Sequence, residues 1–337
     1  MAKVGIIGAG SWGIALAVLL HKNGHEITVW SKIEQEIAML KAEHEHKDKL
    51  PGVKLPEDMV FTTDLQEAVA GRDLLVLAVP SAFTRSTAKL LKSVVEQDQI
   101  IVNVAKGIEE NTLMTLSQII EEEVPQAVVA VLSGPSHAEE VGRGIPTTIV
   151  VGAKKKATAE YLQNIFMNDV FRVYTSSDVL GIELGGSLKN VVALAAGMAD
   201  GLGYGDNTKA ALITRGITEI ARVGVAMGAK FETFCGLTGI GDLIVTCASM
   251  HSRNRRAGIL IGQGKSMEEA MDEVKMVVEG VYSAKAAMGL AEKYQVQLPI
   301  IEQVNQILFE GKAADEAVKD LMLRDKKIEI SDAQWEE

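Results

Sequence analysis

The chain is poor in the residues that mark several classes of protein. It has two cysteines, Cys235 and Cys247, among 337 residues, which gives neither a disulfide framework nor a C-x-x-C pair. Basic residues are outnumbered by acidic ones, 34 against 45, and the net charge of −11 argues against the broad basic face of a nucleic-acid-binding protein. We therefore expect both cysteines to be reduced thiols. Any anion-binding site must be formed by a few local cations.

Long apolar runs are missing as well. No run reaches the ~18 residues expected of a membrane span, and the longest region of low polarity, 191–205, is interrupted by Asp200. An apolar strand pattern begins within a few residues of Met1, which leaves no room for a signal peptide. These absences predict a cytoplasmic protein with no membrane span, no nucleic-acid partner and no bound metal.

The composition that remains is typical of a soluble globular protein, with 47% hydrophobic and 23% charged residues, on a chain long enough for two domains. The first half alternates strand and helix patterns, and most strand patterns are continuous Val/Ile/Leu runs, as in parallel strands covered on both faces. Strands are predicted at 3–7, 26–30, 73–79, 99–104, 127–132, 147–151 and 170–174, and helices at 11–23, 32–43, 83–95, 112–122 and 155–167. The segment 44–58, which contains two prolines, is predicted to be irregular.

Helical patterns replace the strands from about residue 178. They cover 180–200, 207–228, 254–263, 267–272, 281–293, 299–309 and 313–323. In the second of these, Arg215, Glu219 and Arg222 share a polar face opposite an apolar stripe. The sequence therefore predicts an α/β fold, with a doubly wound, Rossmann-like and mainly parallel sheet in residues 1–180 and an all-helical domain in residues 181–337.

Three glycines follow the first strand pattern and open the first helix pattern. Gly8, Gly10 and Gly13 match G-x-G-x-x-G, and the strand pattern at 26–30 completes a βαβ unit. In such a site the first glycine permits a tight turn, the second lets a pyrophosphate approach the backbone, and the third lets helix and strand pack closely. The spacing predicts a dinucleotide-binding loop, and a plain glycine-rich turn is the alternative.

The end of the second strand bears on the choice of cofactor. An NAD site usually has a carboxylate there, about 20 residues beyond the glycines, that binds the ribose 2′-hydroxyl. Here Ser31 and Lys32 follow the strand, and the nearest carboxylates are Glu34 and Glu36. A hydroxyl and an ammonium suit a 2′-phosphate, which favours NADPH over NADH. The alternative for Lys32 is a solvated lysine at a helix start.

Polar side chains also follow later strands, at the edge where ligands of open α/β sheets bind. Lys106 follows one strand, and Gly134, Ser136 and His137 follow another. The Gly-Pro-Ser sequence can start a helix whose free N–H groups bind an anion. His137 is a conceivable acid/base, but a capping or partly buried histidine is the simpler interpretation.

The helical half carries a further lysine in unusual surroundings. On a helix over 180–200, Lys189 has Gly185, Gly186 and two alanines as its neighbours one and two turns away. Such a lysine lies in a hollow that a second backbone or a ligand fills, or it snorkels over a helix–helix contact. Asp242, in a glycine-flanked turn, can orient a lysine, and the planar guanidinium of Arg253 can bind a phosphate.

Together these motifs resemble bacterial NAD(P)-dependent glycerol-3-phosphate dehydrogenase over nearly the whole chain. The residues that carry the resemblance are Gly-Ala-Gly-Ser-Trp-Gly at 8–13, Ala105-Lys106-Gly107, Ser133-Gly-Pro-Ser136, Glu183-Leu-Gly-Gly-Ser-Leu-Lys-Asn190, Leu237-Thr-Gly-Ile-Gly-Asp242 and Ser252-Arg253-Asn254. The resemblance implies an oxidoreductase that reversibly reduces dihydroxyacetone phosphate to sn-glycerol 3-phosphate for glycerophospholipid synthesis. The rival interpretations are a β-hydroxy-acid or sugar-acid-phosphate dehydrogenase and a non-catalytic NAD(P) sensor.

The resemblance also implies roles for individual residues. Lys189 is expected to be the catalytic acid/base, and the expected substrate contacts are Lys106, Gly134, Ser136, Asn190, Asp242, Thr246, Ser252, Arg253 and Asn254. The expected cofactor contacts are Gly8, Gly10, Ser11, Trp12, Gly13, Lys32, Lys106, Ala138, Arg253 and Glu279, for NADPH or alternatively NADH. The family often has arginine or histidine near the position of Lys32. A homodimer is expected, because the helical second domains of such enzymes commonly offer a dimer face.

Overall fold

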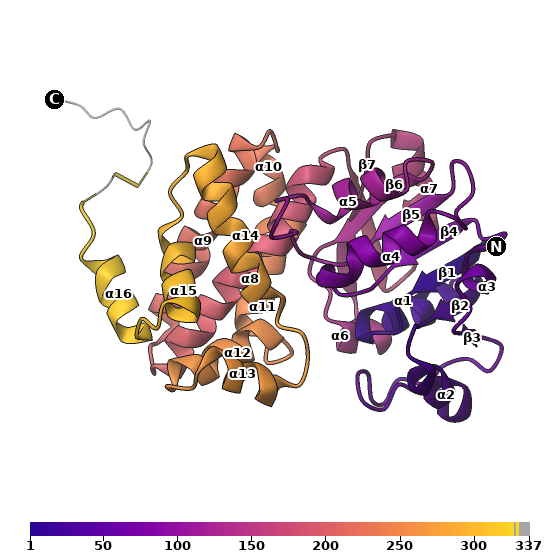
Figure 1. The fold of residues 1–337 in the computed structure, drawn as a ribbon, viewed down its shortest axis with the longest axis horizontal. Helices are drawn as coiled ribbons and strands as arrows, with labels where there is room; N and C mark the ends of the chain where they lie inside the picture. Colours follow the sequence, from indigo (N-terminus) through magenta and orange to yellow (C-terminus); the bar gives the residue numbers. More distant parts are fainter. Residues whose placement is uncertain (327, 330–337) are drawn as a thin grey trace.

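The computed structural model describes residues 1–326 and 328–329. An α/β part and an all-helical part lie side by side along the longest axis of the molecule, with the N-terminus at the α/β end (Figure 1). The α/β part contains β1 (Lys3–Ile7), α1 (Ser11–Lys22), β2 (Glu26–Trp30), α2 (Glu34–Glu43), β3 (Val60–Thr62), α3 (Leu65–Val69), β4 (Leu74–Leu77), α4 (Thr84–Leu91), β5 (Ile100–Asn103), α5 (Leu116–Glu123), β6 (Val128–Ser133), α6 (Ala138–Gly142), β7 (Thr147–Ala153), α7 (Lys156–Phe166) and β8 (Phe171–Ser176). The helical part contains α8 (Val179–Gly201), α9 (Asp206–Ala226), α10 (Phe231–Phe234), α11 (Asp242–Ala248), α12 (Arg253–Gly262), α13 (Met267–Val274), α14 (Glu279–Tyr294), α15 (Pro299–Phe309) and α16 (Ala314–Met322).

The strands of the described residues form one eight-stranded sheet in the order β3-β2-β1-β4-β5-β6-β7-β8. Neighbouring strands pair in parallel, except that β6 and β7 are antiparallel. The prediction of a mainly parallel, doubly wound sheet is therefore confirmed. The strand order reverses beside β1, which has β2 on one side and β4 on the other. In such sheets the ligand crevice opens at this switch point, beyond the carboxyl ends of the strands.

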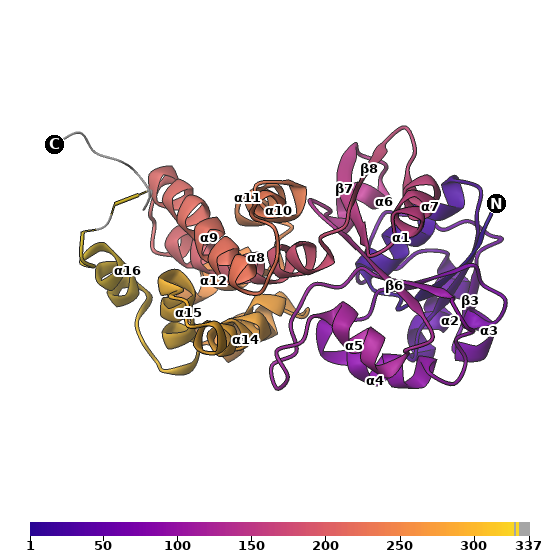
Figure 2. The same cartoon turned by 90° about the horizontal axis from the view of Figure 1, so that it is seen from above.

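Side chains of the strands alternate between two hydrophobic cores, one on each face of the sheet. In β4, Leu74 and Val76 belong to one core, while Leu75 and Leu77 belong to the other. The first core includes residues of α1 and α7, and the second includes residues of α4 and α5. Figure 2 shows α4 and α5 on the opposite side of the sheet from α6 and α7. The strands are continuous apolar runs because both of their faces are covered.

Several short elements are not predicted by the sequence. The segment 44–58 leads into β3, an edge strand of three residues that is too short to give an apolar run. The helices α3 and α6 have five residues each. Between α10 and α11 the chain forms a π-helical turn, Leu237–Gly241, whose glycines interrupt the helical pattern. All these elements are shorter than the windows over which periodicity can be recognised.

The central helix of the helical part is α8, in which residues 181–199 are all buried. Asp178 caps its start by accepting a hydrogen bond from the N–H of Gly181 at 3.0 Å. The helices α8 and α12 touch through their backbones. A Cβ on Gly197 would lie 2.1 Å from a carbonyl oxygen of α12, and a Cβ on Gly258 would lie 2.2 Å from one of α8. This close crossing fixes the position of the residues that follow the start of α12.

Two helical stretches, Val179–Gly201 and Phe231–Ala248, are long and apolar enough to cross a membrane by length and composition alone. This finding corrects the expectation that no run reaches that length. In the first stretch, 83% of the most apolar window is buried inside the protein. Glu183 and Lys189 interrupt it in the sequence, yet both are buried here. The stretch is thus the core helix of a folded domain, and such a buried helix can be as long and as apolar as a membrane span.

Glu219 corrects a second expectation, because it does not share the exposed face of Arg215 and Arg222. It is 4% exposed, and its carboxylate accepts hydrogen bonds from the N–H groups of Ile300 at 2.8 Å and Ile301 at 3.2 Å. These are the first N–H groups of α15, which has no side-chain cap of its own. The residue of α9 therefore serves as a distant cap, and burial raises its pKa to about 7.

Candidate active site

The glycine loop joins β1 to α1 beside the switch point of the sheet. Gly8 has a φ of +120°, and a Cβ on it would lie 2.8 Å from the backbone of Ala78, just after β4. A Cβ on Gly13 would lie 2.2 Å from the carbonyl oxygen of Gly8, whereas nothing lies within 4 Å of a Cβ on Gly10. Gly10 is also the N-cap of α1, so no side chain at that position covers the N–H groups of the first turn. The loop therefore forms an open cradle that fits the pyrophosphate of a dinucleotide.

Lys189 lies at the centre of a buried cluster of charged side chains. Its Nζ donates hydrogen bonds to Asp242 Oδ1 at 2.5 Å and to Thr246 Oγ1 at 2.6 Å. The second carboxylate oxygen of Asp242 accepts a hydrogen bond from Lys106 Nζ at 2.7 Å. Lys106 also donates to the carbonyl of Gly134 at 3.0 Å. The cluster thus joins α8 and α11 of the helical part to the loops that follow β5 and β6.

Burial controls the protonation of this cluster. It lowers the pKa of Lys189 to about 7; Asp242 opposes this shift, and the positive charge of Lys106 adds to it. Burial acts to raise the pKa of Asp242, but the two ammonium groups together hold it below its usual value. The carboxylate is therefore charged at neutral pH, while Lys189 can both give and take a proton.

The two glycines before Lys189 make room for the cluster. A Cβ on Gly185 would lie 2.4 Å from the carbonyl oxygen of Thr238, in the π-helical turn. A Cβ on Gly186 would lie 2.8 Å from Ser133 Oγ and 3.5 Å from the side chain of Lys106. The hollow predicted beside Lys189 is filled by a second backbone on one side and by Lys106 on the other.

A second set of predicted residues is held together where α8, α12 and α14 meet. Asn254 Nδ2 donates to Asn190 Oδ1 at 3.0 Å, and Asn254 Oδ1 accepts a hydrogen bond from the N–H of Gly280 at 2.9 Å. Ser252 caps α12, because its hydroxyl accepts a hydrogen bond from the N–H of Arg255 at 3.2 Å. These bonds fix both amides and the first turn of α12, which carries Arg253.

Arg253 keeps its donors free. In the part of the chain that the structure describes, its guanidinium has no hydrogen bond or ion pair. Burial lowers its pKa, and the nearby negative charge of Glu279 opposes that shift. A partly buried guanidinium with unused donors suits two-pronged binding of a phosphate group.

Glu279, at the start of α14, connects the helical part to the crevice of the sheet. Its Oε1 accepts a hydrogen bond from the N–H of Ser81 at 3.1 Å, and the hydroxyl of Ser81 donates to its Oε2. A Cβ on Gly107 would lie 2.3 Å from Ser81 Cβ, so the loops after β4 and β5 also touch. Burial raises the pKa of Glu279, against the effect of these hydrogen bonds. The expected cofactor contact therefore lies at the junction of both parts.

The other predicted residues lie around this crevice. Ser11 and Trp12 form the first turn of α1, beside the cradle. Ser136 Oγ donates to the carbonyl of Gly134 at 2.8 Å, and Ala138 begins α6. Lys32 is exposed after β2, outside the charged cluster. No group of three or more His, Cys, Asp or Glu side chains that could hold a metal occurs within residues 1–326 and 328–329.

His137 lies beside the charged cluster without joining it. Its Nε2 is buried and has no partner among the described residues, and its ring centroid lies 5.7 Å from that of His251. Burial and the positive charge of Lys189 lower its pKa, so the imidazole is neutral at pH 7. This environment supports the simpler interpretation of a partly buried histidine.

Glu183, for which the sequence predicts no role, is buried against the residues that precede Lys106. Its Oε1 accepts hydrogen bonds from Asn103 Nδ2 at 3.2 Å and from the N–H of Ser117 at 2.9 Å. The same Asn103 amide group donates to the carbonyl of Ala105, directly before Lys106. Burial raises the pKa of Glu183. A charged residue in an otherwise apolar helix, six positions before Lys189, is the signal that could have identified it.

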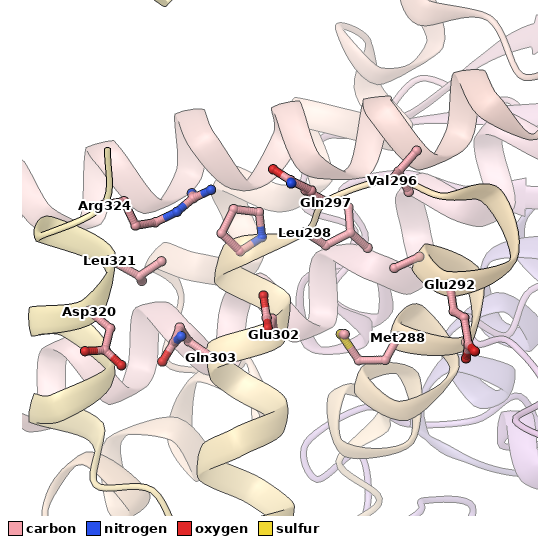
Figure 3. A pocket seen from close by; sticks show the side chains of 13 residues that line it. Met288, Glu292, Val296, Gln297, Leu298, Glu302, Gln303, Asp320, Leu321 and Arg324 are labelled. Atoms are coloured by element: carbon pink, nitrogen blue, oxygen red, sulfur yellow. The ribbon is translucent and has the colours of Figure 1, made fainter. Parts of the chain in front are cut away.

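A cavity of about 650 Å³ lies apart from all of these residues, between α14, α15 and α16. Figure 3 shows the side chains around it, among them Met288, Glu302, Gln303 and Arg324. None of the predicted substrate or cofactor residues lines it. A smaller cavity of about 140 Å³ is lined by Ser136 and His137, next to the charged cluster. Size alone therefore does not identify the reaction site, which depends on convergent charged groups.

Comparisons with known proteins agree with the family resemblance that the sequence motifs indicate. A family model described as NAD-dependent glycerol-3-phosphate dehydrogenase N-terminus matches residues 3–159, and one described as the C-terminus of the same enzyme matches residues 178–319. The chain is 68% identical over 335 residues to glycerol-3-phosphate dehydrogenase (NAD(P)+) of Agathobacter rectalis, over 99% of this chain and 100% of that one. It is 65% identical over 332 residues to the enzyme of that name from Fusobacterium nucleatum, over 98% and 99% of the two chains. A crystal structure of glycerol-3-phosphate dehydrogenase from Coxiella burnetii matches with a TM-score of 0.93 at 35% identity, over 96% of this chain and 99% of that one.

Proposed function

The chain belongs to the NAD-dependent glycerol-3-phosphate dehydrogenase family, and from this premise we propose that it reversibly reduces dihydroxyacetone phosphate to sn-glycerol 3-phosphate. The observation that carries the proposal is the buried cluster of Lys189, Asp242 and Lys106, at the same carboxyl edge of the parallel sheet as a cradle that fits a dinucleotide. A bound nicotinamide cofactor supplies the hydride. The residues of the chain must then manage the charge and the proton at the carbonyl oxygen.

Lys189 is the proposed acid/base. As negative charge develops on the carbonyl oxygen, its ammonium donates a proton, and in the reverse reaction its neutral amine accepts one. A pKa of about 7 makes both forms available near neutral pH. Asp242 holds the Nζ in place, and Lys106 adds positive charge that stabilises the developing alkoxide.

Arg253 is the proposed phosphate-binding residue, because its donors are free and Ser252 fixes the start of its helix. The proposed substrate contacts also include Gly134 and Thr246, which bond to the cluster, Ser136, which bonds to Gly134, and Asn190 and Asn254, which bond to each other. Binding the phosphate at a fixed distance from Lys189 orients the carbonyl for reaction.

The proposed cofactor residues are those of the cradle and the crevice: Gly8, Gly10, Ser11, Trp12, Gly13, Lys32, Lys106, Ala138, Arg253 and Glu279. The open space at Gly10 supports the assignment of the cradle. NADPH is the proposed preferred cofactor, because lysine follows β2 where NAD sites usually have a carboxylate.

Several broader features of the function are proposals as well. Residues 1–180 would form the nucleotide-binding domain and residues 181–337 the catalytic domain, and the product would supply glycerophospholipid synthesis in the cytoplasm. A homodimer is proposed through the helical part, where the exposed apolar side chains of Val225 and Phe231 lie close together in the chain.

Steady-state kinetics tests the proposed function. Purified protein is assayed with NADPH and with NADH against dihydroxyacetone phosphate, and with NADP+ and with NAD+ against β-hydroxy acids and sugar-acid phosphates in the oxidising direction. We expect turnover of dihydroxyacetone phosphate alone to be fast. Turnover of a hydroxy acid or a sugar-acid phosphate in its place would support the rival dehydrogenases. Tight cofactor binding with no turnover of any of these substrates would support the sensor.

A further inference from the structure

A buried polar cluster lies where β2 ends, and none of the roles described above uses it as a whole. We call it the β2 cluster; it consists of Ser31, Glu36, His46 and Lys49. The carboxylate of Glu36 is at its centre and is 7% exposed. Its Oε2 accepts a hydrogen bond from the hydroxyl of Ser31. Its Oε1 accepts one from His46 Nε2 at 2.9 Å and one from Lys49 Nζ.

The charges of the β2 cluster follow from these contacts. His46 Nδ1 accepts a hydrogen bond from the N–H of Lys49 at 3.3 Å, which leaves its Nε2 to donate to Glu36. Burial acts to raise the pKa of Glu36, but its three hydrogen-bond donors lower it to about 2. The β2 cluster therefore pairs one carboxylate with one ammonium, and Ser31 and His46 supply two further hydrogen bonds to the carboxylate.

The β2 cluster lies next to the dinucleotide cradle. Trp30, the last residue of β2, accepts a hydrogen bond from the N–H of Gly8 at 2.9 Å, and Ser31 follows it directly. In Rossmann-like sheets this strand end is where the ribose 2′ position of the cofactor is bound. Glu36 and Ser31 thus occupy the place at which an NAD site offers its carboxylate.

The carboxylate of Glu36 is not available for a ribose hydroxyl, because three donors already engage its two oxygens. Lys49 is different, since it has three N–H donors, gives one to Glu36, and keeps 37% of its side chain exposed. Lys32 is exposed and has no hydrogen bond or ion pair in the described part of the chain. Two ammonium groups therefore keep free donors at this strand end, where Glu34 is the nearest exposed carboxylate.

We propose that Lys49, together with Lys32, binds the 2′-phosphate of NADPH, and that Glu36 is the positioning residue that holds Lys49 at the end of β2. The segment 44–58, irregular in sequence, thereby contributes a specificity determinant to a site that the glycine loop begins. His46 Nε2 donates a further hydrogen bond to Glu36 Oε1 and so helps to fix the orientation of the carboxylate. This inference deepens the proposed function, because it requires that the chain binds a nicotinamide dinucleotide.

Isothermal titration of the full chain with NADPH and with NADH tests the proposal without any substrate. We expect the wild-type protein to bind NADPH more tightly than NADH. Lys49→Ala should raise the Kd for NADPH about tenfold, the loss of one charge-assisted hydrogen bond, and leave the Kd for NADH unchanged. Lys49→Arg should restore most of the difference. The salt dependence of NADPH binding should also weaken in Lys49→Ala, because one ionic contact is lost.

Lys54→Ala is the matched control. Lys54 belongs to the same segment and pairs with Glu45 at 2.6 Å, and in the part of the chain that the structure describes it has no hydrogen bond or ion pair with the β2 cluster. Its removal deletes the same charge and should leave both Kd values unchanged. If Lys54→Ala weakens NADPH binding as much as Lys49→Ala does, a general charge effect explains the result and the proposal is wrong.

A double-mutant cycle tests the positioning role of Glu36. Glu36→Ala should weaken NADPH binding, and the double variant Glu36→Ala/Lys49→Ala should be no weaker than Lys49→Ala, because Glu36 acts through Lys49. Tighter NADPH binding by Glu36→Ala, or additive losses, would overturn that role. Equal wild-type affinities for the two cofactors would overturn the whole inference. Tight cofactor binding with no reduction of dihydroxyacetone phosphate would overturn only the proposed function.

Discussion

Asp242 and Glu219 are both buried carboxylates of the helical part, and they differ in what surrounds them. Asp242 is 1% exposed and contacts the ammonium groups of Lys106 and Lys189. Glu219 is 4% exposed and contacts backbone N–H groups at the start of α15. The pKa of Asp242 lies below its usual value, whereas that of Glu219 is raised to about 7.

The difference shows that direct contact with a cation, and not burial, decides whether a buried carboxylate is charged here. Burial acts to raise the pKa of both groups, and the backbone N–H donors of Glu219 do not reverse it. Asp242 can therefore serve as a fixed negative charge that holds a proton-transferring lysine. Glu219 itself exchanges a proton near neutral pH.

The largest effect is expected from removing the lysine that Asp242 holds. Lys189→Ala should lower kcat for reduction of dihydroxyacetone phosphate about 10³-fold, because the proton donor is lost. The Kd of the cofactor should change little, since Lys189 is not one of its proposed contacts. Stopped-flow or steady-state assays give kcat, and titration calorimetry gives the Kd.

Lys209→Ala is the matched control for that variant. Lys209 pairs with Asp200 at 2.9 Å, at the far end of α8 from Lys189. Its loss should leave kcat within about twofold, because this partly buried pair has no contact with Lys189 or Asp242 among the described residues. Near-normal turnover by Lys189→Ala would remove Lys189 from the mechanism and leave Asp242 with a structural role only.

A second prediction concerns the charge of Asp242 itself. Ketone reduction needs the protonated form of Lys189, so the rate should fall as pH rises through about 7. Because Asp242 acts to raise the pKa of Lys189, Asp242→Asn should move this fall to lower pH. The substitution should also lower kcat at pH 7 about 10²-fold, since it leaves two ammonium groups without their counter-charge. The pH dependence of kcat measures both effects.

Asp200→Asn is the matched control for Asp242→Asn. Asp200 also holds two cations, Lys209 at 2.9 Å and Arg255 at 2.7 Å, but outside the site. Its substitution should leave the midpoint of the pH profile in place. An equal shift in both variants would mean that the pH profile depends on the net charge of the helical part. The contact between Asp242 and Lys189 would then not determine the pKa of Lys189.

The glycine loop and the contact between Lys189 and Asp242 differ in how well the sequence predicts them. The glycine loop is predicted in detail, because its geometry depends on spacing over six residues and a strand on each side. The importance of Lys189 and Asp242 follows from motifs, but their contact joins residues 53 positions apart and depends on how α8 and α11 pack. Sequence spacing contains no information on that packing.

Glu219 and Glu36 show where the prediction from sequence fails. Helical periodicity places Glu219 on a polar face with Arg215 and Arg222, and only the distant start of α15 explains why it is buried. Glu36 resembles an ordinary charged residue of a first helical turn until the segment 44–58 folds back to supply His46 and Lys49. In both cases the partner is remote in the sequence and carries no local signal.

A third, smaller effect is expected on stability. The pKa of Glu219 is raised from 4.5 to about 7 in the folded state, so the folded protein binds more protons than the unfolded chain between these values. The free energy of unfolding should therefore include a contribution that is fully present below pH 4.5 and is lost as pH rises through 7. Between pH 5 and 7 this loss is about 2 kcal/mol.

Urea unfolding at pH 5 and pH 7 isolates this contribution when the wild-type protein is compared with Glu219→Gln. Glutamine keeps an oxygen for the N–H groups of Ile300 and Ile301 but does not titrate. The wild-type protein should lose more stability than the variant over this range. The same slope in both proteins would mean that Glu219 is charged in the fold without a cation in contact, contrary to the comparison with Asp242.

The smallest effect is expected at Glu183, a third buried carboxylate of the helical part. Like Glu219 it forms no ion pair within residues 1–326 and 328–329, and burial raises its pKa. Glutamine retains an oxygen for Asn103 and Ser117, so Glu183→Gln should change kcat/KM within about twofold and the free energy of unfolding by about 1 kcal/mol. Glu183→Ala removes the acceptor of three hydrogen bonds, from Asn103 Nδ2 and from the N–H and hydroxyl of Ser117, and should cost about 2 kcal/mol. If glutamine proves as damaging as alanine, the negative charge itself is needed at Glu183, and a buried carboxylate in this protein can remain charged on neutral donors alone.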